Sequence, residues 1–430
     1  MSKLKLVVVG VTAVVAVTAI FLFLSADRVI PLGKIIAKVA EPIIVDPNAD
    51  APPQKPLANP PKIIKAIYAT NWSASSEKKI LYFLDLLNTT ELNTIVLDIK
   101  DYTGIVGYES EVPAVKEYDA SEKRIPKINA LIKRFHDAGV YVIGRIAVFQ
   151  DDALAKARPD WAVKSRASGG VWSDYKKVVW LDTGATPVWD YNIDIAREAI
   201  GRGFDEINFD YIRFPTDGDL TDVVYPFSGP NLNRRSILSQ FFRHLRSQLP
   251  YARISADIFG EAIVNNTETL IGQFFEDTLE PFEAVAPMIY PSHFHKNFIG
   301  LANSATEPYP VIRYAMDRAL DRVRGYREKL LNSDVGSSTL ILPALSEIRP
   351  WLQDFNLGAT YDARMVRAQI TAVDDSARAV ANCPGIEVSS KNHSVLNEAD
   401  QVRQPCDYQP IGWMLWNASN NYTRGALLPE

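Results

Sequence analysis

Residues 203–215 read GFDEINFDYIRFP, an apolar run that polar side chains interrupt at alternating positions. In an extended strand Asn208 and Asp210 would share one face, and Ile207 and Phe209 would take the other. Gly203 is typical of a residue that follows a helix, so we expect a helix before this strand. The stretch therefore predicts a β-strand that follows a helix and carries a carboxylate towards its carboxyl end.

Outward from this stretch, short apolar runs alternate with longer segments whose apolar residues recur every three or four positions. The predicted strands are residues 63–70, 94–100, 140–149, 206–214, 253–259, 284–290, 340–345 and 411–417. The predicted helices are residues 75–87, 126–138, 187–201, 233–248, 268–279, 311–331 and 362–380. Each connection is long enough for a helical crossover, which predicts a parallel sheet.

Eight parallel strands with intervening helices can close into a barrel. An open doubly wound sheet would show the same alternation, but no glycine-rich phosphate loop follows the first predicted strand. We therefore predict an α/β fold of the (β/α)8 TIM-barrel type. Long insertions after several strands fit a barrel of this length.

Composition narrows the possible functions. The 430 residues are 47% hydrophobic and 23% charged, with a formal net charge of -5, two cysteines and five histidines. The acidic balance argues against nucleic acid as a partner, because a nucleic-acid interface needs a basic face. Two cysteines are too few for a disulfide scaffold or a cysteine-rich metal module. No cofactor is implied.

The amino terminus predicts a membrane anchor. Residues 6–24 carry no charge and follow Lys3 and Lys5, a length and a charge pattern typical of a signal anchor with its amino end in the cytoplasm. A cleaved signal peptide and a buried core helix are the alternatives, although Leu24 makes a poor cleavage site.

Residues 41–61 are rich in proline and predict an extended tether. We expect a transmembrane segment over residues 1–27, a Pro-rich linker over 28–61 and the barrel over 62–430. The barrel would then lie on the extracytoplasmic side of the cell membrane, either periplasmic or extracellular.

Chemistry in such barrels sits at the carboxyl ends of the strands. Asp210 and Asp257 fall on neighbouring predicted strands and form the best candidate catalytic pair, because glycosidic bond cleavage uses two carboxyl groups. Glu261 and Glu347 are further candidates for the acid. The residues expected to contact a substrate are Asp98, Lys100, Arg145, Asn208, Arg213, Tyr290, His293, Glu347 and Trp416.

Several of these residues also have a purely structural interpretation. Asp98 would share a face with Lys100 and could form a salt bridge with it or with Arg145. His293 and His295 resemble a metal-binding pair, but the first predicted strand lacks the His-x-His of barrel metallohydrolases, and we predict no metal. Trp416 could stack on a sugar or belong to the core.

The two cysteines, Cys383 and Cys406, precede the last predicted strand. In an oxidising compartment we expect them to form a disulfide. The alternative is a pair of unrelated thiols.

Five segments resemble the motifs of a bacterial family of putative glycosyl hydrolase barrels. They are residues 203–215 (GFDEINFDYIRFP), 254–260 (ISADIFG), 285–293 (VAPMIYPSH), 96–101 (VLDIKD) and 144–146 (GRI). The likeness extends over roughly residues 62–425, and the motif at 203–215 is its most specific part.

This family is similar to the α-amylase clan, in which an aspartate on strand four is the nucleophile and a glutamate on strand five is the acid. The resemblance implies Asp210 as the nucleophile. It leaves the acid open, because Asp257 stands on the matching fifth strand and Glu261 lies a turn beyond it.

We therefore expect a membrane-anchored extracytoplasmic glycoside hydrolase that acts on a polysaccharide or cell-envelope glycan. Asp210 would be the nucleophile or base, Asp257 or Glu261 the acid, and Tyr290 and Trp416 would contact the sugar. A non-catalytic glycan-binding or envelope-scaffold protein on the same barrel is the main alternative. A metal-dependent hydrolase or deacetylase is a third.

Overall fold

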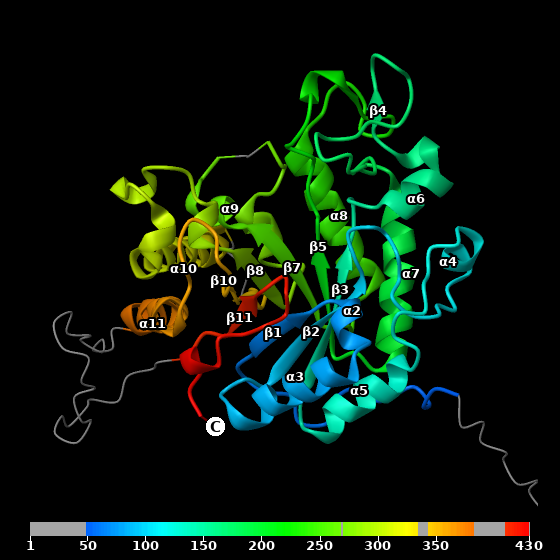
Figure 1. Ribbon diagram of the computed structural model, residues 1–430. Coiled ribbons are helices and arrows are strands. Elements are labelled where there is room, and N and C mark those ends of the chain that lie inside the picture. The colour runs from blue at the N-terminus through cyan, green and yellow to red at the C-terminus, as the bar shows by residue number, and fades with distance from the viewer. Residues whose placement is uncertain (1–48, 268–269, 334–342, 382–408, 430) are drawn as a thin grey trace, which may run out of the picture. The chain divides into compact units, whose positions relative to one another are not determined.

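The computed structural model describes residues 49–267, 270–333, 343–381 and 409–429 (Figure 1). In this part of the chain, parallel strands form one closed sheet at the centre of the fold. The strands are β1 (Lys65–Ala69), β2 (Thr94–Lys100), β3 (Tyr141–Ala147), β5 (Glu206–Asp210), β7 (Ile254–Phe259), β8 (Ala284–Met288), β9 (Glu347–Ile348), β10 (Trp351–Gln353) and β11 (Trp413–Trp416). A small antiparallel pair, β4 (Lys164–Ser165) and β6 (Val223–Val224), lies in the loops.

The sheet closes because its last strand pairs with its first. The strands follow one another in chain order from β1 to β9, β8 also pairs with β10, and β11 pairs with both β10 and β1. The short strands β9 and β10 together occupy the seventh position, so the eight-strand barrel predicted from the sequence is confirmed. Tyr68 and Tyr422 bond across the closing seam, where the hydroxyl of Tyr422 accepts the N–H of Tyr68 at 2.9 Å.

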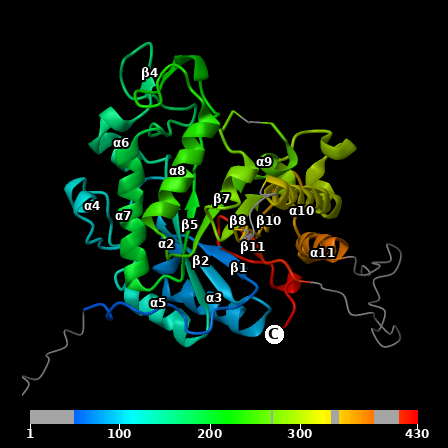
Figure 2. The ribbon, with the colours of Figure 1, turned by 180° about the vertical axis from the view of Figure 1, so that it is seen from behind.

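Helices surround the strands, as the two opposite views show (Figures 1 and 2). They are α2 (Asn71–Ala74), α3 (Glu77–Thr89), α4 (Pro113–Glu117), α5 (Ile128–Asp137), α6 (Asp152–Ala157), α7 (Thr186–Arg202), α8 (Arg234–Gln248), α9 (Gly260–Val264), α10 (Pro308–Ser333) and α11 (Ala363–Val380). Gly203 ends α7 with a φ of +107°, a left-handed conformation that suits glycine. The helix predicted before β5 is thus confirmed.

Side chains alternate between two layers along the strands. Ile67 and Ala69 of β1 join the large apolar layer between strands and helices, whereas Ala66 and Tyr68 join a small cluster inside the barrel. The interior also holds charged groups. Arg349 forms an ion pair with Glu206 there, and both side chains are almost completely buried.

The seventh strand lies later in the chain than predicted. Residues 343–346 form no strand, residues 340–342 are outside the described part, and β9 and β10 begin only at Glu347. Proline explains the shift: Pro343 lacks the N–H that an internal strand must donate, and Pro350 divides the true strand into two pieces. The prediction of the seventh strand at the apolar residues 340–345 is therefore wrong.

The fifth predicted helix, residues 268–279, is also wrong. The described part of it contains only a short 3-10 turn, Phe275–Thr278, and the helix that follows β7 is the five-residue α9. Gly272 has a φ of +79°, which interrupts any continuous helix through this segment.

The compact unit begins at Asp50, before the predicted start at Lys62. Asp50 accepts hydrogen bonds from the N–H groups of Asn129 and Ala130 at the start of α5, so part of the proline-rich segment contacts the barrel. No helix within the described ranges is both long and apolar enough to cross a membrane. The predicted anchor at residues 1–27 and the predicted pair Cys383 and Cys406 lie outside the described residues.

Candidate active site

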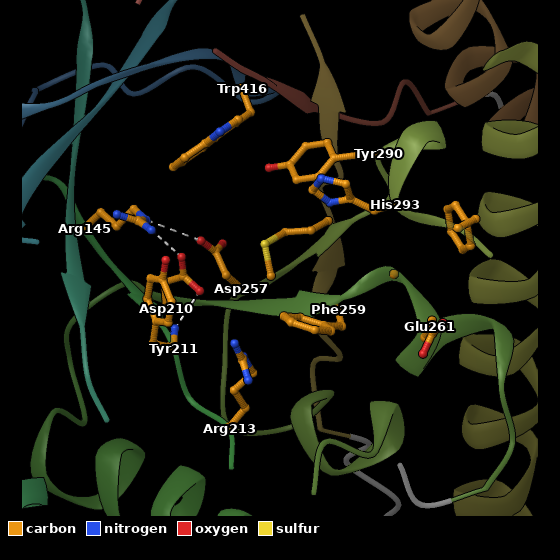
Figure 3. Close-up of a pocket in the computed structure, with 13 residues that line it drawn as sticks. Arg145, Asp210, Tyr211, Arg213, Asp257, Phe259, Glu261, Tyr290, His293 and Trp416 are labelled. Atoms are coloured by element: carbon orange, nitrogen blue, oxygen red, sulfur yellow. Dashed lines mark hydrogen bonds and ion pairs between the residues drawn. The ribbon is translucent and has the colours of Figure 1, made fainter. Parts of the chain in front are cut away.

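A cavity of about 430 Å³ opens at the carboxyl ends of the barrel strands (Figure 3). Its volume is in the range of small-molecule sites. The residues that line it come from β3, β5, β7, β8 and β11 and from the loops after them, because parallel strands all end on the same side of a barrel. They are Arg145, Asp210, Tyr211, Arg213, Asp257, Phe259, Gly260, Glu261, Met288, Tyr290, His293, Phe294 and Trp416.

Arg145 on β3 stands at the centre of the charged groups. Its guanidinium donates to Asp98 at 2.5 Å, donates to Asp210 through a second nitrogen, and lies 3.7 Å from Asp257. All four side chains are buried. In such surroundings an uncompensated charge is costly. One cation among three carboxyl groups therefore favours a state in which one of the acids keeps its proton.

Asp210 ends β5 directly before a sharp backbone turn. Tyr211 has a φ of +53°, a conformation that bulky residues rarely adopt. The turn allows the N–H of Tyr211 to donate to Oδ1 of Asp210 at 2.5 Å, while Arg145 bonds to Oδ2. Donors to both oxygens stabilise an ionised carboxylate. Strained backbone of this kind is common at functional positions.

Asp257 on β7 has a different environment. Its Oδ1 accepts hydrogen bonds from Nδ2 of Asn208 at 2.9 Å and from Nε1 of Trp351 at 2.8 Å. Burial and the nearby charge of Asp210 raise the pKa of Asp257 to about 8. Asp257 therefore carries a proton at neutral pH. Because Oδ1 already accepts two N–H donors, the proton belongs on Oδ2, the oxygen on the Arg145 side.

Aromatic side chains flank the charged groups. In the view of Figure 3, Trp416 and Tyr290 lie above Asp257, and Phe259 lies below it. Trp416 stacks on Tyr68 with ring centroids 4.0 Å apart and planes inclined by 15°. Tyr290 meets the ring of His293 edge-on, with centroids 5.1 Å apart. A flat ligand with apolar faces would find ring surfaces on both sides of the carboxyl groups.

Comparison with known families decides the assignment of this barrel. A family model described as "Putative glycosyl hydrolase domain" matches residues 66–380, which include most of the barrel and every charged residue of the cavity described above. The chain belongs to this family. The glycosyl hydrolase domain is thereby placed among the enzymes that hydrolyse O-glycosyl bonds, whose substrates are carbohydrates.

Solved structures similar to the glycosyl hydrolase domain include three of varied origin. A hypothetical protein from Ruminiclostridium thermocellum is 41% identical, with 44% of this chain and 96% of that chain covered and a TM-score of 0.41. The glycoside hydrolase domain of PelA from Pseudomonas aeruginosa is 13% identical, with coverages of 74% and 92% and a TM-score of 0.38. The α-galactosidase TtGalA from Thermus thermophilus is 15% identical, with coverages of 57% and 47% and a TM-score of 0.36. No curated protein matches the chain.

Most of the site residues predicted from the sequence line the cavity of the glycosyl hydrolase domain. They are Asp210, Asp257, Glu261, Arg145, Arg213, Tyr290, His293 and Trp416. Asp98 and Asn208 lie one layer deeper. Asp98 accepts hydrogen bonds from Arg145 and from the hydroxyl of Tyr68, and Asn208 bonds to Asp257, so both orient cavity residues and do not line the cavity.

The predicted pairing of Lys100 with Asp98 is wrong. The register of β2 against β3 shifts between these two residues, and this bulge turns Lys100 out of the barrel. Lys100 instead forms a fully buried ion pair with Asp151 at 2.6 Å and donates to Asn192 of α7. Lys100 is therefore no substrate contact in this structure.

Glu261 and Glu347 both lie away from the carboxyl pair Asp210 and Asp257, but at different places in the barrel. Glu261 lies on α9 at the rim, away from Asp210 and Asp257 in Figure 3. Glu347 begins β9 and pairs in register with Ala284, the first residue of β8. That position is at the amino ends of the strands, opposite the cavity. The late start of the seventh strand explains why Glu347 does not reach the mouth.

Two residues that orient the site were not predicted. Tyr68 donates to Asp98 at 2.5 Å and stacks on Trp416, and Trp351 donates to Asp257. Tyr68 lies in an apolar run, where an aromatic residue is expected to belong to the core. Trp351 lies outside every predicted strand, because the seventh strand was predicted at residues 340–345. For Tyr68, its place two residues after Ala66 on the inward face of β1 was an available signal.

The histidines do not form a metal-binding pair. His293 lines the cavity, whereas the ring of His295 packs against Phe298 and its Nδ1 lies 2.9 Å from the carbonyl of Lys296. Within the described ranges, no three His, Cys, Asp or Glu residues are grouped closely enough to hold a metal ion.

Proposed function

We propose that the chain is a membrane-anchored, extracytoplasmic glycoside hydrolase that cleaves a polysaccharide or cell-envelope glycan with Asp210 and Asp257. The observation that carries this proposal is the unequal environment of the two carboxyl groups around Arg145. Asp210 is bonded to Arg145 and to a backbone N–H, and the pKa of Asp257 is raised to about 8. A pair of carboxyl groups with different protonation is what glycosidic bond cleavage requires.

In this mechanism Asp257 is the acid. Its Oδ2 proton passes to the glycosidic oxygen as the bond from that oxygen to the anomeric carbon breaks, so that the leaving sugar departs as a neutral alcohol. The carboxylate of Asp210 attacks or stabilises the positive anomeric carbon. Water then supplies a hydroxyl group to that carbon, and its remaining proton restores Asp257 in a retaining course or passes to Asp210 in an inverting one.

The aromatic side chains position the sugar. Trp416 is held by its stack on Tyr68, and Tyr290 is held by His293 and Phe355, so the two rings keep a fixed place beside Asp257. The hydroxyl of Tyr290 forms no hydrogen bond with any described residue and is available to a sugar hydroxyl. Rigid placement of this kind lowers the entropic cost of binding.

The location of the enzyme rests on the sequence. Residues 6–24 are uncharged and follow two lysines, and residues 41–61 are rich in proline. An anchor followed by a tether would hold the cavity outside the cytoplasmic membrane, where cell-envelope and secreted polysaccharides occur.

The test is a digestion screen with the full-length chain against cell-wall and exopolysaccharide fractions. We expect new reducing ends from the wild type and none above background from Asp210→Asn or Asp257→Asn. Asp152→Asn is the matched control, because Asp152 is an acid outside the cavity that pairs with Lys156, and its activity should equal the wild type. If the wild type and Asp210→Asn bind the same glycan equally and neither cuts it, the domain is a binding module and the proposal fails.

A further inference from the structure

Arg213 is a buried cation of the cavity wall without an acidic partner among the described residues. The residue is 8% exposed, and no carboxylate in those ranges forms an ion pair with it. Among the described residues only Nη1 donates hydrogen bonds, to the carbonyl of Phe214 at 3.0 Å and to the hydroxyl of Thr216 at 3.5 Å. The N–H groups of Nε and Nη2 have no partner there.

The other buried arginines of the described chain are all paired. Arg145 bonds to Asp98 and Asp210, Arg322 bonds to Glu276, and Arg349 bonds to Glu206. A buried guanidinium without a counter-ion destabilises a protein. The absence of a counter-ion at Arg213 therefore requires a reason. Arg213 differs from Arg322 and Arg349 because it lines the cavity.

The surroundings of Arg213 leave its edge open. Its guanidinium carbon lies 4.6 Å from the ring centroid of Trp180 and 4.7 Å from that of Phe259. Rings that cover a guanidinium fix its plane and leave the N–H groups at its edge free. Figure 3 shows the guanidinium directed into the cavity, below Asp257 and beside Phe259.

The free edge of Arg213 favours a planar anion as its partner. Arg145 forms ion pairs with Asp98 and Asp210, whereas Arg213 forms none within the described residues, so its remaining N–H groups are available to a ligand. A carboxylate is planar and accepts two parallel hydrogen bonds from the edge of a guanidinium.

We propose that Arg213 binds the carboxylate of a uronic acid residue beside Asp210 and Asp257, which makes the substrate an acidic polysaccharide. This inference rests on the proposed glycan-binding function of the cavity. It makes Arg213 a specificity-determining residue that would select an acidic sugar over its neutral counterpart.

The experiment measures binding by isothermal titration calorimetry to the full-length chain. The probes are D-glucuronate with D-glucose, and D-galacturonate with D-galactose, because each pair differs only at C6. At least one uronate should bind about 10- to 100-fold more tightly than its neutral partner, the range expected for hydrogen bonds to a charged group. Arg213→Gln should abolish this preference, and Arg213→Lys, which keeps the charge without the planar fork, should retain part of it.

Arg158→Gln is the matched control. Arg158 also lies over a tryptophan ring, that of Trp161, but it pairs with Asp160 on the surface outside the cavity, so its loss should leave the preference unchanged. Thermal unfolding of each variant separates loss of binding from loss of fold. Galactose 6-sulfate tests the other common acidic substituent.

Three results would overturn the proposal: equal binding of uronate and neutral sugar, a preference that survives Arg213→Gln in a folded protein, or tighter binding of the sulfate ester than of both uronates. Because a monosaccharide has no glycosidic bond to cut, the outcome does not depend on hydrolysis. Loss of cleavage in the digestion screen with an intact uronate preference would reject the hydrolase and keep the acidic ligand.

Discussion

Asp257 can act as an acid only while it holds its proton. Since burial and Asp210 raise its pKa to about 8, we expect kcat to fall as the pH rises through about 8. A pH–rate profile, measured on the first glycan found to be cut, would test for this fall in kcat. A rate that keeps rising above about pH 8 would contradict the assignment of Asp257 as the acid.

The same proton affects stability, with a definite sign. The pKa of aspartate in an unfolded chain is about 3.9. Between that value and about 8 the folded protein binds more protons than the unfolded one, so the free energy of unfolding should fall as the pH rises through this window. Asp257→Asn cannot titrate and should show a flatter dependence. Urea unfolding of both proteins across the window measures the difference, and parallel curves would show that Asp257 is not the group responsible.

Arg145 is expected to tolerate no substitution, even by lysine. A lysine ammonium cannot reproduce the fork that joins Asp98 and Asp210, so Arg145→Lys should lose activity and about 3–5 kcal/mol of stability if one carboxylate is left unpaired. Arg367→Lys is the comparison, because Arg367 forms a partly exposed ion pair with Glu91 and should cost less than about 1 kcal/mol. Equal losses in chemical denaturation would mean that the network around Arg145 contributes no more than a surface pair.

At the scale of single residues, the sequence is informative where a charge interrupts an apolar strand. Asp210, Asp257 and Arg145 were predicted for that reason, since a buried charge needs either a partner or a function. Tyr68 was missed because an aromatic side chain in a strand has the same pattern whether it packs in the core or donates a hydrogen bond to a buried carboxyl group. Trp351 was missed because the seventh strand was predicted too early in the chain.

At the scale of elements, the bulge in β2 creates a fully buried ion pair between Lys100 and Asp151. Lys100→Met should destabilise the protein by about 3–5 kcal/mol, because it leaves the Asp151 charge buried and alone. The double variant Lys100→Met/Asp151→Asn should regain part of that loss, since asparagine keeps the oxygen that accepts the N–H of Leu154 at the start of α6. Urea unfolding of Lys100→Met, Asp151→Asn and the double variant tests this, and strictly additive losses would show that the pair is not coupled.

Strand and helix positions were predictable where an apolar period ran without interruption. Seven of the eight strand positions follow from such runs. The seventh strand and the fifth helix did not, because Pro350 and Gly272 act through backbone geometry and hydrogen bonding, which apolar periodicity does not register. The bulge at Lys100 could not be predicted for a similar reason, since one extra residue in a strand leaves the composition of the strand almost unchanged.

At the scale of the whole molecule, the predicted anchor has a direct test. The full-length chain should sediment with the cell membrane, whereas a chain that lacks residues 1–27 and is made in the cytoplasm should stay in the supernatant. Protease added to intact spheroplasts should degrade the barrel of the anchored form. A full-length chain that is released by high salt alone would contradict the prediction of a spanning segment.

The seam between β1 and β11 sets an order of events during synthesis. Tyr68 and Tyr422, which bond across it, are 354 residues apart in the chain. Until β11 has been made, β1 and β10 each present a strand edge with unpaired backbone groups, the kind of surface on which nascent chains aggregate. The barrel can close only after β11 has been synthesised, so this protein is expected to depend on chaperones that hold the open sheet apart from its neighbours until β11 is available.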